Sequence, residues 1–312
     1  VEVDANADKD DVLIPGIKEN IERTGVHSGD SFCVYPPQNI SQKVMDTLVD
    51  YTKRIAVALR VVGLMNIQFV VKDEKVYIIE VNPRASRTVP ILSKVTKIPM
   101  VQIAMQVILG DKLADLPYGT GVSPTTNLIA VKAPVFSFVK LGDVDVALTP
   151  EMKSTGEVLG IDTKYDRAML KAFLGAGFRF NETGKVIFSV NDHAKAEGVK
   201  YAKYFESKGF ELVATKGTAK YLSDQGIVCS ELASVDIIAI QEMMKRDEIA
   251  FVVNIPTKGK DIRRAGFKLR TLAERLKVPC FTCYDTVGAY MMAMEAYIEE
   301  EPLTYEPIAY YC

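Results

Sequence analysis

Three oxygen-bearing side chains fall on two strand-like runs of the sequence. The runs L-M-N-I-Q-F-V-V and V-Y-I-I-E-V-N are rich in β-formers and are joined by K-D-E-K, which predicts a hairpin. If Lys72 pairs with Val76, the register advances one residue on each strand at every step. Gln68 then lies opposite Glu80, and Asn82 lies on the same face two residues further along. Such oxygen ligands, with few charges, suit Mg²⁺, which completes its shell with waters and substrate phosphates.

Two arginines follow this hairpin directly. Arg84 and Arg87 stand in N-P-R-A-S-R, so the sequence places two planar cations beside the predicted metal ligands. Metal ions that bridge phosphates, together with arginines that hold an anionic acceptor, are the parts that phosphoryl transfer needs. The alternative is an exposed polar face on an ordinary hairpin, because Gln and Asn are common there. The residues alone leave both interpretations open.

A second group of polar residues lies in the last third of the chain. In A-T-K-G-T-A-K-Y-L, an apolar strand end is followed by Thr215 and Thr218 and then by a helical pattern. Free N–H groups at a helix start, two hydroxyls and a lysine can cradle a phosphate, although Thr is also a common N-cap. Asn254, Thr257 and Lys258 follow another strand-like run. Because ligands bind at the carboxyl ends of parallel strands, these two loops predict a binding site.

The cysteines predict structure rather than chemistry. There are five, at Cys33, Cys229, Cys280, Cys283 and Cys312. An odd number at irregular spacing is no disulfide framework and predicts a reducing, cytoplasmic environment. The lone C-x-x-C lies in the apolar run V-P-C-F-T-C-Y and lacks a second ligand pair nearby, so we expect buried strand cysteines rather than a zinc or redox site. Only two histidines are present, and triad chemistry is poorly supported.

The composition sets the class of protein. A chain of 312 residues suggests two domains, and 48% hydrophobic with 25% charged residues is typical of a globular protein. The net charge of −2 shows no excess of positive charge, so it does not predict binding to nucleic acid or to an anionic membrane. No apolar run approaches the roughly 20 residues that span a bilayer. The sequence opens with V-E-V-D, without Met or a signal peptide, and we expect a piece of a longer chain.

The elements that must position these residues differ between the two halves. The first half predicts strands broken by a turn at Pro15-Gly16, a helix capped by Ser41, the hairpin, and a helix over 98–110. In the capped helix, the apolar residues Val44, Leu48, Ile55 and Leu59 recur at helical intervals. An irregular strand region over 117–149 follows, and E-M-K-S-T-G-E-V-L-G then reads as a connecting loop before the helix Y-D-R-A-M-L-K-A-F-L.

From about residue 184, strands and helices alternate. The strand-like runs are V-I-F-S-V, F-E-L-V-A, A-F-V-V-N-I and C-F-T-C-Y, with helical patterns near 194–207 and 218–225. An amphipathic helix is predicted by the repeat, at three and four residues, of Ile262, Ala265, Leu269, Leu272 and Leu276. This alternation predicts a doubly wound parallel sheet, and hence an α/β fold class for this part of the chain.

Several of these motifs together resemble a known family. Q-F-V-V, I-I-E-V-N-P-R-A-S-R-T-V-P, I-E-R-T-G-V-H-S-G-D-S and E-M-K-S-T-G-E-V-L-G are similar to the carboxy-terminal lobe of ATP-grasp enzymes, specifically to the large subunit of carbamoyl-phosphate synthases. The resemblance covers essentially the whole chain. It implies an α+β ATP-grasp lobe over 1–149, a connecting loop and helix over 150–183, and a methylglyoxal-synthase-like allosteric domain over 184–312.

The resemblance also implies roles for the first group of residues. Gln68 and Glu80 would bridge Mg²⁺ or Mn²⁺ to the phosphates of ATP, with Asn82 completing the metal set. Arg84 and Arg87 would face the phosphoryl acceptor, carbamate. The segment touching ATP would be Gly25, Val26, His27 and Ser28.

In that family the last domain binds nucleotide effectors, typically UMP as an inhibitor. Lys195, Thr215, Thr218 and Asn254 match the family's effector contacts. Some members also bind ornithine between the two parts. Residues matching that pocket are Glu22, Asp30, Tyr284 and Thr286. Ala133 stands where a further carboxylate would be expected, a loss of about 1.5–3 kcal/mol for a charged hydrogen bond, so we do not expect ornithine activation.

The family's full enzyme has parts that this sequence lacks, namely the first ATP-grasp lobe, the bicarbonate-phosphorylating half, an oligomerisation segment and a glutaminase small subunit as partner. We therefore expect a ligase in the complete, oligomeric enzyme. The alternative is that the chain alone is an inactive regulatory nucleotide-binding module. A biotin-dependent carboxylase is disfavoured by E-M-K-S-T-G-E and by the absence of M-K-M. The sequence leaves open the effector (UMP, IMP, phosphoribosyl pyrophosphate or ornithine) and the pathway (pyrimidine or arginine biosynthesis).

Overall fold

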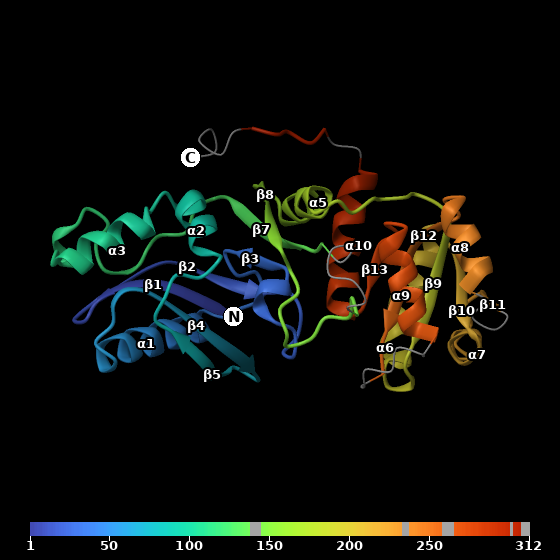
Figure 1. The fold of residues 1–312 in the computed structure, drawn as a ribbon, viewed down its shortest axis with the longest axis horizontal. Helices are drawn as coiled ribbons and strands as arrows, with labels where there is room; N and C mark the ends of the chain where they lie inside the picture. Colours follow the sequence, from blue (N-terminus) through green and yellow to red (C-terminus); the bar gives the residue numbers. More distant parts are fainter. Residues whose placement is uncertain (138–144, 233–236, 258–264, 300–301, 307–312) are drawn as a thin grey trace.

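The computed structural model describes residues 1–312 apart from 138–144, 233–236, 258–264, 300–301 and 307–312. Two β-sheets lie next to each other along the long axis of the molecule (Figure 1). Helices α5 (Tyr165–Gly175) and α10 (Tyr284–Ile298) lie between the sheets. The mixed α/β class predicted from the sequence is confirmed.

The first sheet contains eight strands among the described residues. Its order is β5-β4-β1-β2-β3-β7-β8, with antiparallel neighbours, and the short β6 pairs with β2 in parallel. In chain order the strands are β1 (Glu2–Asp8), β2 (Val12–Asn20), β3 (Cys33–Tyr35), β4 (Val62–Lys72), β5 (Lys75–Asn82), β6 (Gly121–Val122), β7 (Ile129–Val135) and β8 (Gly156–Asp162).

Helices cover both faces of this sheet. Helix α1 (Gln42–Ala58) packs on one face, and α2 (Val89–Thr96) and α3 (Met100–Leu109) pack on the other (Figure 1). The predicted N-cap of α1 is confirmed, because Ser41 Oγ accepts a hydrogen bond of 3.4 Å from the backbone N–H of Val44. The predicted helical pattern does not extend to Leu59. This residue follows the end of the helix and is 59% exposed.

The predicted turn at Pro15-Gly16 is also wrong, since β2 runs straight through it. The turn lies earlier, where the Asp8 carboxylate accepts a 2.8 Å hydrogen bond from the Asp11 N–H. Gly16 is needed for a different reason. A Cβ at this position would overlap the ring of Tyr35, so the glycine permits close packing rather than chain reversal.

The segment expected to be a connecting loop contributes a strand instead. Residues of E-M-K-S-T-G-E-V-L-G enter β8, which pairs with β7 and completes the first sheet. The helix predicted after it is confirmed as α5. Gly160 lets β8 approach α5, because a Cβ there would overlap the backbone of Ala168 and Ala172. The division of the chain at 149/150 and 183/184 stays a prediction.

The second sheet is parallel throughout its described strands and confirms the predicted doubly wound architecture. Its order is β11-β10-β9-β12-β13. The strands are β9 (Lys185–Val190), β10 (Glu211–Thr215), β11 (Cys229–Leu232), β12 (Ile249–Ile255) and β13 (Cys280–Phe281). One face packs against α8 (Ile237–Lys245) and α9 (Ala265–Arg275), and the other against α6 (Lys195–Ser207), α7 (Lys216–Asp224) and α10.

The C-x-x-C does not lie wholly in a strand, as the sequence suggested. Strand β13 contains Cys280, but Cys283 is the N-cap of α10. Burial raises the pKa of both thiols to about 12, so neither is a thiolate near neutral pH. The prediction of two buried strand cysteines is therefore wrong in part, because both side chains are half-buried and only Cys280 lies in a strand.

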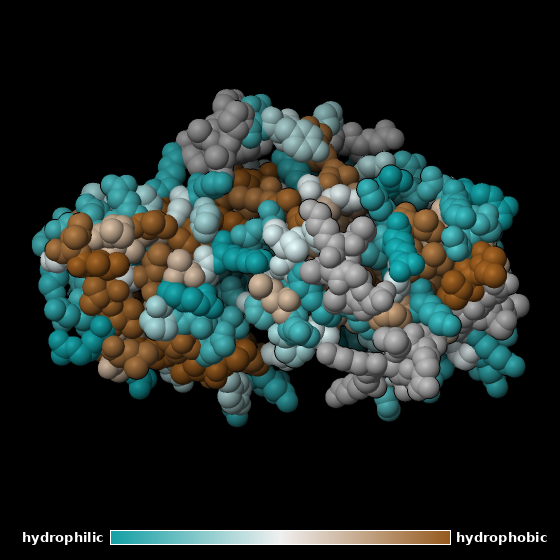
Figure 2. Space-filling model, viewed as in Figure 1, coloured by the Kyte–Doolittle hydropathy of each residue, from teal (hydrophilic) through white to brown (hydrophobic). Residues whose placement is uncertain are grey.

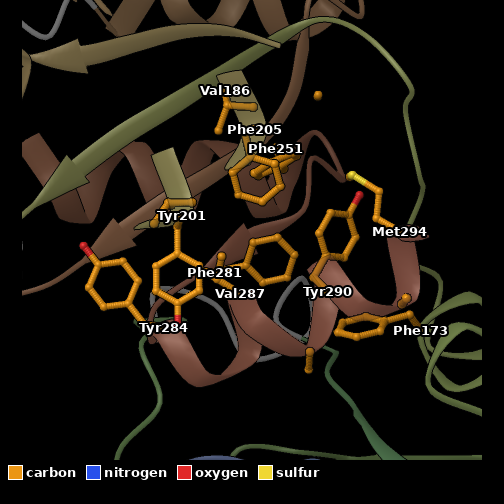
Figure 3. Close-up of a cluster of buried hydrophobic side chains, with 14 of the residues drawn as sticks. Phe173, Val186, Tyr201, Phe205, Phe251, Phe281, Tyr284, Val287, Tyr290 and Met294 are labelled. Atoms are coloured by element: carbon orange, nitrogen blue, oxygen red, sulfur yellow. The ribbon is translucent and has the colours of Figure 1, made fainter. Parts of the chain in front are cut away.

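A cluster of aromatic rings connects the two sheets. Phe32, beside β3, lies 4.5 Å from Phe173 of α5, and Phe173 lies 5.5 Å from Tyr290 of α10, centroid to centroid. Tyr290 in turn lies 5.3 Å from Phe251 of β12. Figure 3 shows Phe173 and Tyr290 approaching this cluster from different helices. Buried side chains of both sheets thus belong to one continuous core.

Exposed apolar side chains gather on α3, at one end of the molecule (Figure 2). They are Val101, Met105, Ile108 and Leu109. Among the described residues, no single helix is long and apolar enough to cross a membrane. Helices α2 and α3 reach that length and composition only as a pair bent by 105°.

Candidate functional site

The β4–β5 hairpin pairs Gln68 with Glu80 as predicted, but its turn and its register differ from those assumed in the prediction. Asp73 and Glu74 form a two-residue turn with φ values of 50° and 61°, one residue shorter than predicted. A bulge beside Phe69 then shifts the register by one residue. Gln68 consequently lies opposite Glu80, and the predicted pairing is confirmed.

A cavity of about 320 Å³ opens beside this hairpin. It brings together six residues that the sequence singled out: His27, Ser28, Gln68, Glu80, Arg84 and Arg87. Asn82 lies next to them and donates a 2.8 Å hydrogen bond to Glu80 Oε1. Gly25 and Val26 precede the loop but are not among the residues that line the cavity.

The His27 loop is held by hydrogen bonds on several sides. His27 Nδ1 accepts a 3.0 Å hydrogen bond from the Gly29 N–H and caps a short 3₁₀ helix, so this ring nitrogen has a structural task. Gln68 Nε2 donates to Ser28 Oγ over 3.1 Å. Lys132 Nζ donates to the carbonyl groups of Ser28 and Gly29 over 3.0 and 3.2 Å. Lys132 therefore fixes the loop on the side away from the hairpin.

The two arginines differ in their hydrogen-bond partners. Arg84 is exposed, and its Nη1 donates to the neighbouring carbonyl of Ala85 over 3.0 Å. Arg87 is also exposed, but its Nη1 donates to both the carbonyl oxygen and Oγ of Ser154 over 3.3 Å. Arg87 is thus tied to the segment that precedes β8, while Arg84 is free to move toward an anion.

A buried charge network beside the cavity was missed by the sequence reasoning. Lys18 Nζ lies 2.6 Å from Asp4 and 3.2 Å from Glu2, and it also bonds Thr88. Burial opposes ionisation of both carboxyl groups, but the Lys18 ammonium outweighs it and lowers the pKa of Asp4 and of Glu2. The missed signal was E-V-D-A-N at the start of the chain, where polar residues alternate in a buried strand.

Glu157 is a second cavity residue that the sequence reasoning did not select, although it lies in E-M-K-S-T-G-E. Burial raises its pKa, against the opposing effect of Lys132 and Arg87. Its Oε2 is buried and has no hydrogen-bond partner among the described residues. A buried carboxyl oxygen without a partner, next to two cations, marks the wall of the cavity where a polar ligand would gain a hydrogen bond.

The donor set suits a divalent cation. Gln68 and Glu80 line the cavity with an amide and a carboxylate, and Asn82, which does not line it, is hydrogen-bonded to Glu80. The described residues contain no group of three or more His, Cys, Asp or Glu side chains placed to hold a metal. A single carboxylate supported by amides matches an ion such as Mg²⁺, or Mn²⁺, that takes its remaining ligands from phosphates and water.

The residues predicted to bind an effector lie at neighbouring strand ends of the second sheet. Thr215 is the N-cap of α7, and the Lys195 ammonium lies beside the first turn of that helix, where a Cβ on Gly217 would be 3.2 Å away. Thr218 is only 2% exposed, and its Oγ1 lies 3.4 Å from the backbone N and O of Val190. Its hydroxyl is thus occupied within the fold.

The other predicted effector residues lie across β9. Asn254 and Thr257 line a cavity of about 160 Å³ with Arg270, which the sequence reasoning did not select. Arg270 Nη1 donates to Asn254 Oδ1 over 2.6 Å. Lys258 lies outside the described residues. The predicted set therefore divides into a turn at the start of α7, beside Lys195, and a small polar cavity at the end of β12.

Comparison with known proteins adds the family. Residues 1–116 match the family described as "Carbamoyl-phosphate synthase L chain, ATP binding domain", and residues 197–282 match the "MGS-like domain". The carbamoyl phosphate synthase large chain of Lachnoclostridium phytofermentans is 49% identical over 297 residues, 95% of this chain. That of Caldanaerobacter subterraneus is 49% identical over 294 residues, 94% of this chain. The chain belongs to the carbamoyl-phosphate synthase large-chain family. It spans 28% and 27% of the length of these two relatives.

Two solved structures that match the chain resemble it only weakly. The biotin carboxylase domain of a single-chain bacterial carboxylase superposes with a TM-score of 0.43 and 15% identity, covering 56% of this chain and 45% of that one. Rhizobium etli pyruvate carboxylase superposes with a TM-score of 0.37 and 20% identity, covering 43% and 14%. These similarities are too low to bear on function.

For this carbamoyl-phosphate synthase family member, the pocket matched to ornithine in the sequence is partly assembled. Glu22, Asp30 and Thr286 line a cavity of about 340 Å³ between the two parts, and Thr286 Oγ1 donates to Glu22 Oε1 over 2.8 Å. Tyr284 does not line it and donates to the Ala194 carbonyl instead. Burial raises the pKa of Glu22. Most of the remaining wall is apolar, which does not favour a ligand with two charged groups.

Proposed function

We propose that, in the complete enzyme, the 320 Å³ cavity is where the γ-phosphoryl group of ATP is transferred to carbamate. The β–γ bridging P–O bond of ATP would break, a carbamate oxygen would bond to the phosphorus, and ADP and carbamoyl phosphate would result. The observation that carries this proposal is the meeting of Gln68, Glu80, Arg84 and Arg87 in one cavity.

Each group has a task that follows from its position. Gln68, Glu80 and Asn82 would hold Mg²⁺ or Mn²⁺, which when bound neutralises phosphate charge. Arg84 is exposed and able to meet the anionic acceptor, and Arg87 lines the cavity while its Nη1 is bonded to Ser154. Planar, permanently charged donors suit carboxylate-like acceptors and the charge spread over the transferring phosphoryl oxygens.

The His27–Ser28 loop would border the nucleotide. Lys132 holds two of its carbonyl groups, so the loop presents Ser28 Oγ toward Gln68 in the cavity. A loop fixed before the substrate arrives avoids the cost of ordering it during the reaction. The glutaminase small subunit and the rest of the large chain belong to the same proposal, because this chain spans only 28% of its relative.

The test is Glu80→Gln in the complete enzyme. The change keeps the size of the side chain and removes the only carboxylate among the three proposed metal ligands, so we expect ATP-dependent carbamoyl phosphate formation to fall about 100-fold or more. The control is Glu74→Gln on the same hairpin, where Glu74 accepts a 2.8 Å hydrogen bond from Ser41 Oγ away from the cavity. Near-normal synthesis by Glu80→Gln would place the metal elsewhere.

We also propose that the second sheet binds a nucleotide monophosphate, with UMP as the first candidate. The α7 turn at Thr215 and the nearby Lys195 ammonium support it, because helix N–H groups and a cation attract phosphate. Lys195→Met should weaken UMP binding about ten-fold, measured by calorimetry, and Lys200→Met on the same helix should not. Thr218→Ala is a poorer test, because that hydroxyl also contacts Val190. Equal UMP affinity of wild type and Lys195→Met would refute the assignment.

A further inference from the structure

Arg270 of α9 joins the two parts of the molecule through a two-pronged ion pair. Its Nε donates to Asp145 Oδ1 over 2.8 Å, and its Nη2 donates to Asp145 Oδ2 over 2.6 Å. The Arg270 side chain is only 6% exposed, while that of Asp145 is 27% exposed. Paired, charge-assisted hydrogen bonds of this kind are strong and hold both groups in one plane.

The same arginine touches the proposed effector site. Its Nη1 donates to Asn254 Oδ1 over 2.6 Å, and Arg270, Asn254 and Asp145 all line the 160 Å³ cavity. Gly266 makes room for this arrangement, since a Cβ there would lie 3.3–3.5 Å from the Asn254 amide and Arg270 Nη1. A guanidinium has more N–H donors than these three bonds use, so it is able to turn toward an acceptor in the cavity.

From Asp145 a short segment leads to the first sheet. The Asp145 carbonyl oxygen accepts a 2.9 Å hydrogen bond from Lys153 Nζ. The backbone N–H groups of Lys153 and Ser154 both donate to the Asp30 carboxylate over 2.8 Å. The segment is therefore fastened at both ends, to α9 through Asp145 and to the lobe through Asp30.

This segment then touches two sides of the cavity proposed for phosphoryl transfer. The carbonyl oxygen of Thr149 accepts a 2.9 Å hydrogen bond from the His27 N–H, and Ser154 Oγ donates to the Gly29 carbonyl over 3.1 Å. Ser154 also accepts the bonds from Arg87. A shift of residues 145–154 would consequently move both the nucleotide loop and an acceptor arginine.

We propose that Arg270 is a switch, for which Asp145 and an anionic ligand in the 160 Å³ cavity compete. This inference rests on the effector binding proposed above and names its means of regulation. With the cavity empty, Arg270 holds Asp145 and fixes the 145–154 segment. A second anionic group near Asn254, distinct from the phosphate placed at the α7 turn, draws the guanidinium away. The released segment then loosens its hold on the His27 loop and Arg87.

Competition for Arg270 predicts tighter ligand binding when Asp145 is removed, which simple damage to the fold would not produce. If Asp145 and the ligand compete for Arg270, removing the carboxylate makes binding tighter, because less work is needed to free the guanidinium. The ligand then has no ion pair left to break, so it no longer changes the affinity for ATP, as reciprocity between the binding free energies at the two sites requires. A variant that was merely distorted would bind more weakly.

The experiment compares the complete enzyme with its Asp145→Asn and Asp145→Ala variants. Phosphoribosyl pyrophosphate, which carries two separate phosphate groups, is the first probe, with UMP, IMP and inorganic phosphate as further arms. We measure the Kd of each probe by calorimetry and the change in the KM for ATP at saturating probe. Both variants should bind the active probe about five-fold more tightly or better, and the probe should no longer change the KM for ATP.

The control is Glu197→Gln, which breaks another ion pair between the two parts. Glu197 lies 3.2 Å from Arg23 and does not line the cavity, so the Kd and the effect of the probe should both stay at wild-type values. Unchanged or weaker binding in the Asp145 variants, or a full effect on the KM for ATP, overturns the switch alone. A wild-type enzyme that binds none of the probes overturns both the switch and the effector assignment. The Glu80→Gln variant tests only the phosphoryl-transfer site, so its result is independent of these two proposals.

Discussion

At the scale of single residues, the most constrained group is Lys18. Its ammonium is 1% exposed and lies between two carboxylates, Asp4 and Glu2, beneath the cavity. Taking three charges out of water is tolerable only while each has its partner. The network therefore fixes the ends of β1 and β2 beside the proposed nucleotide site, and the loss of one partner has a large cost.

We expect Asp4→Asn to destabilise the fold by about 3 kcal/mol, because it leaves the buried Lys18 with one counter-charge fewer. The control is Asp11→Asn, which removes an exposed pair with Lys53 and should cost about 0.5 kcal/mol or less. Urea unfolding at pH 7 measures both. Similar values for the two variants would show that the buried pair contributes no more than a surface one.

The same network predicts a pH dependence. The pKa values of Asp4 and Glu2 are lowered in the fold, from ordinary values of 3.8 and 4.5. A lowered carboxyl pKa contributes stability that is present above the ordinary value and is lost as the pH falls through the folded one. Stability should decline below about pH 4.5, and Asp4→Asn should show a smaller decline over that range. A decline of equal size in both proteins would contradict the assignment.

At the scale of elements, the close contact between β8 and α5 requires a glycine at position 160. Gly160→Ala should destabilise the protein by about 2 kcal/mol or more, because the added methyl group meets helix backbone that has no rotamer to change. Gly156→Ala on the same strand is the matched control, since its Cβ would lie 3.9 Å from Val135 in ordinary contact. Thermal melting of the two variants checks the difference, and equal melting temperatures would disprove it.

The elements also show which parts of the fold and of the candidate site could be predicted from the sequence. The pairing of Gln68 with Glu80 was predictable from strand period and composition, yet two departures cancelled on the way, a shorter turn and a bulge. Helix α10 was not predicted, because it is buried on most sides and carries little amphipathic pattern. Arg270 gave no signal, since its partner Asp145 is 125 residues away in sequence. Long-range pairs of this kind are set by tertiary packing, which no local pattern encodes.

At the scale of the whole molecule, the proposed activity and the proposed binding should separate. We expect the 312-residue chain alone to make no carbamoyl phosphate from ATP, bicarbonate and ammonia, because it spans 28% of its relative. The same preparation should still bind UMP without ATP, which shows that it is folded. Product formation above background by the chain alone would contradict this expectation. The cytoplasmic location and the oligomeric state stay predictions.

The shared core predicts that the two sheets unfold together. Phe173 of α5 contacts rings from both sides, so neither sheet keeps its interior if the other opens. Calorimetry should show one transition, and Phe173→Ala, at a cost of about 3–5 kcal/mol, should lower its midpoint without splitting it. Two resolved transitions in the wild-type chain would show that the aromatic cluster does not couple them.

That cluster also limits how the protein can be recombined with its relatives. A chimaera joined at residue 184 would take α10 from one family member and α5 from another. The ring of Tyr290 would then have to pack against Phe173 and Phe180 of a different protein. In the native chain these two rings lie 5.5 and 4.6 Å from that of Tyr290. Moving the junction to the turn between β8 and α5 would transfer these rings as one set. Functional exchange of effector specificity between family members should therefore depend on where the chain is cut, with junctions before Tyr165 tolerated better than junctions after Phe180.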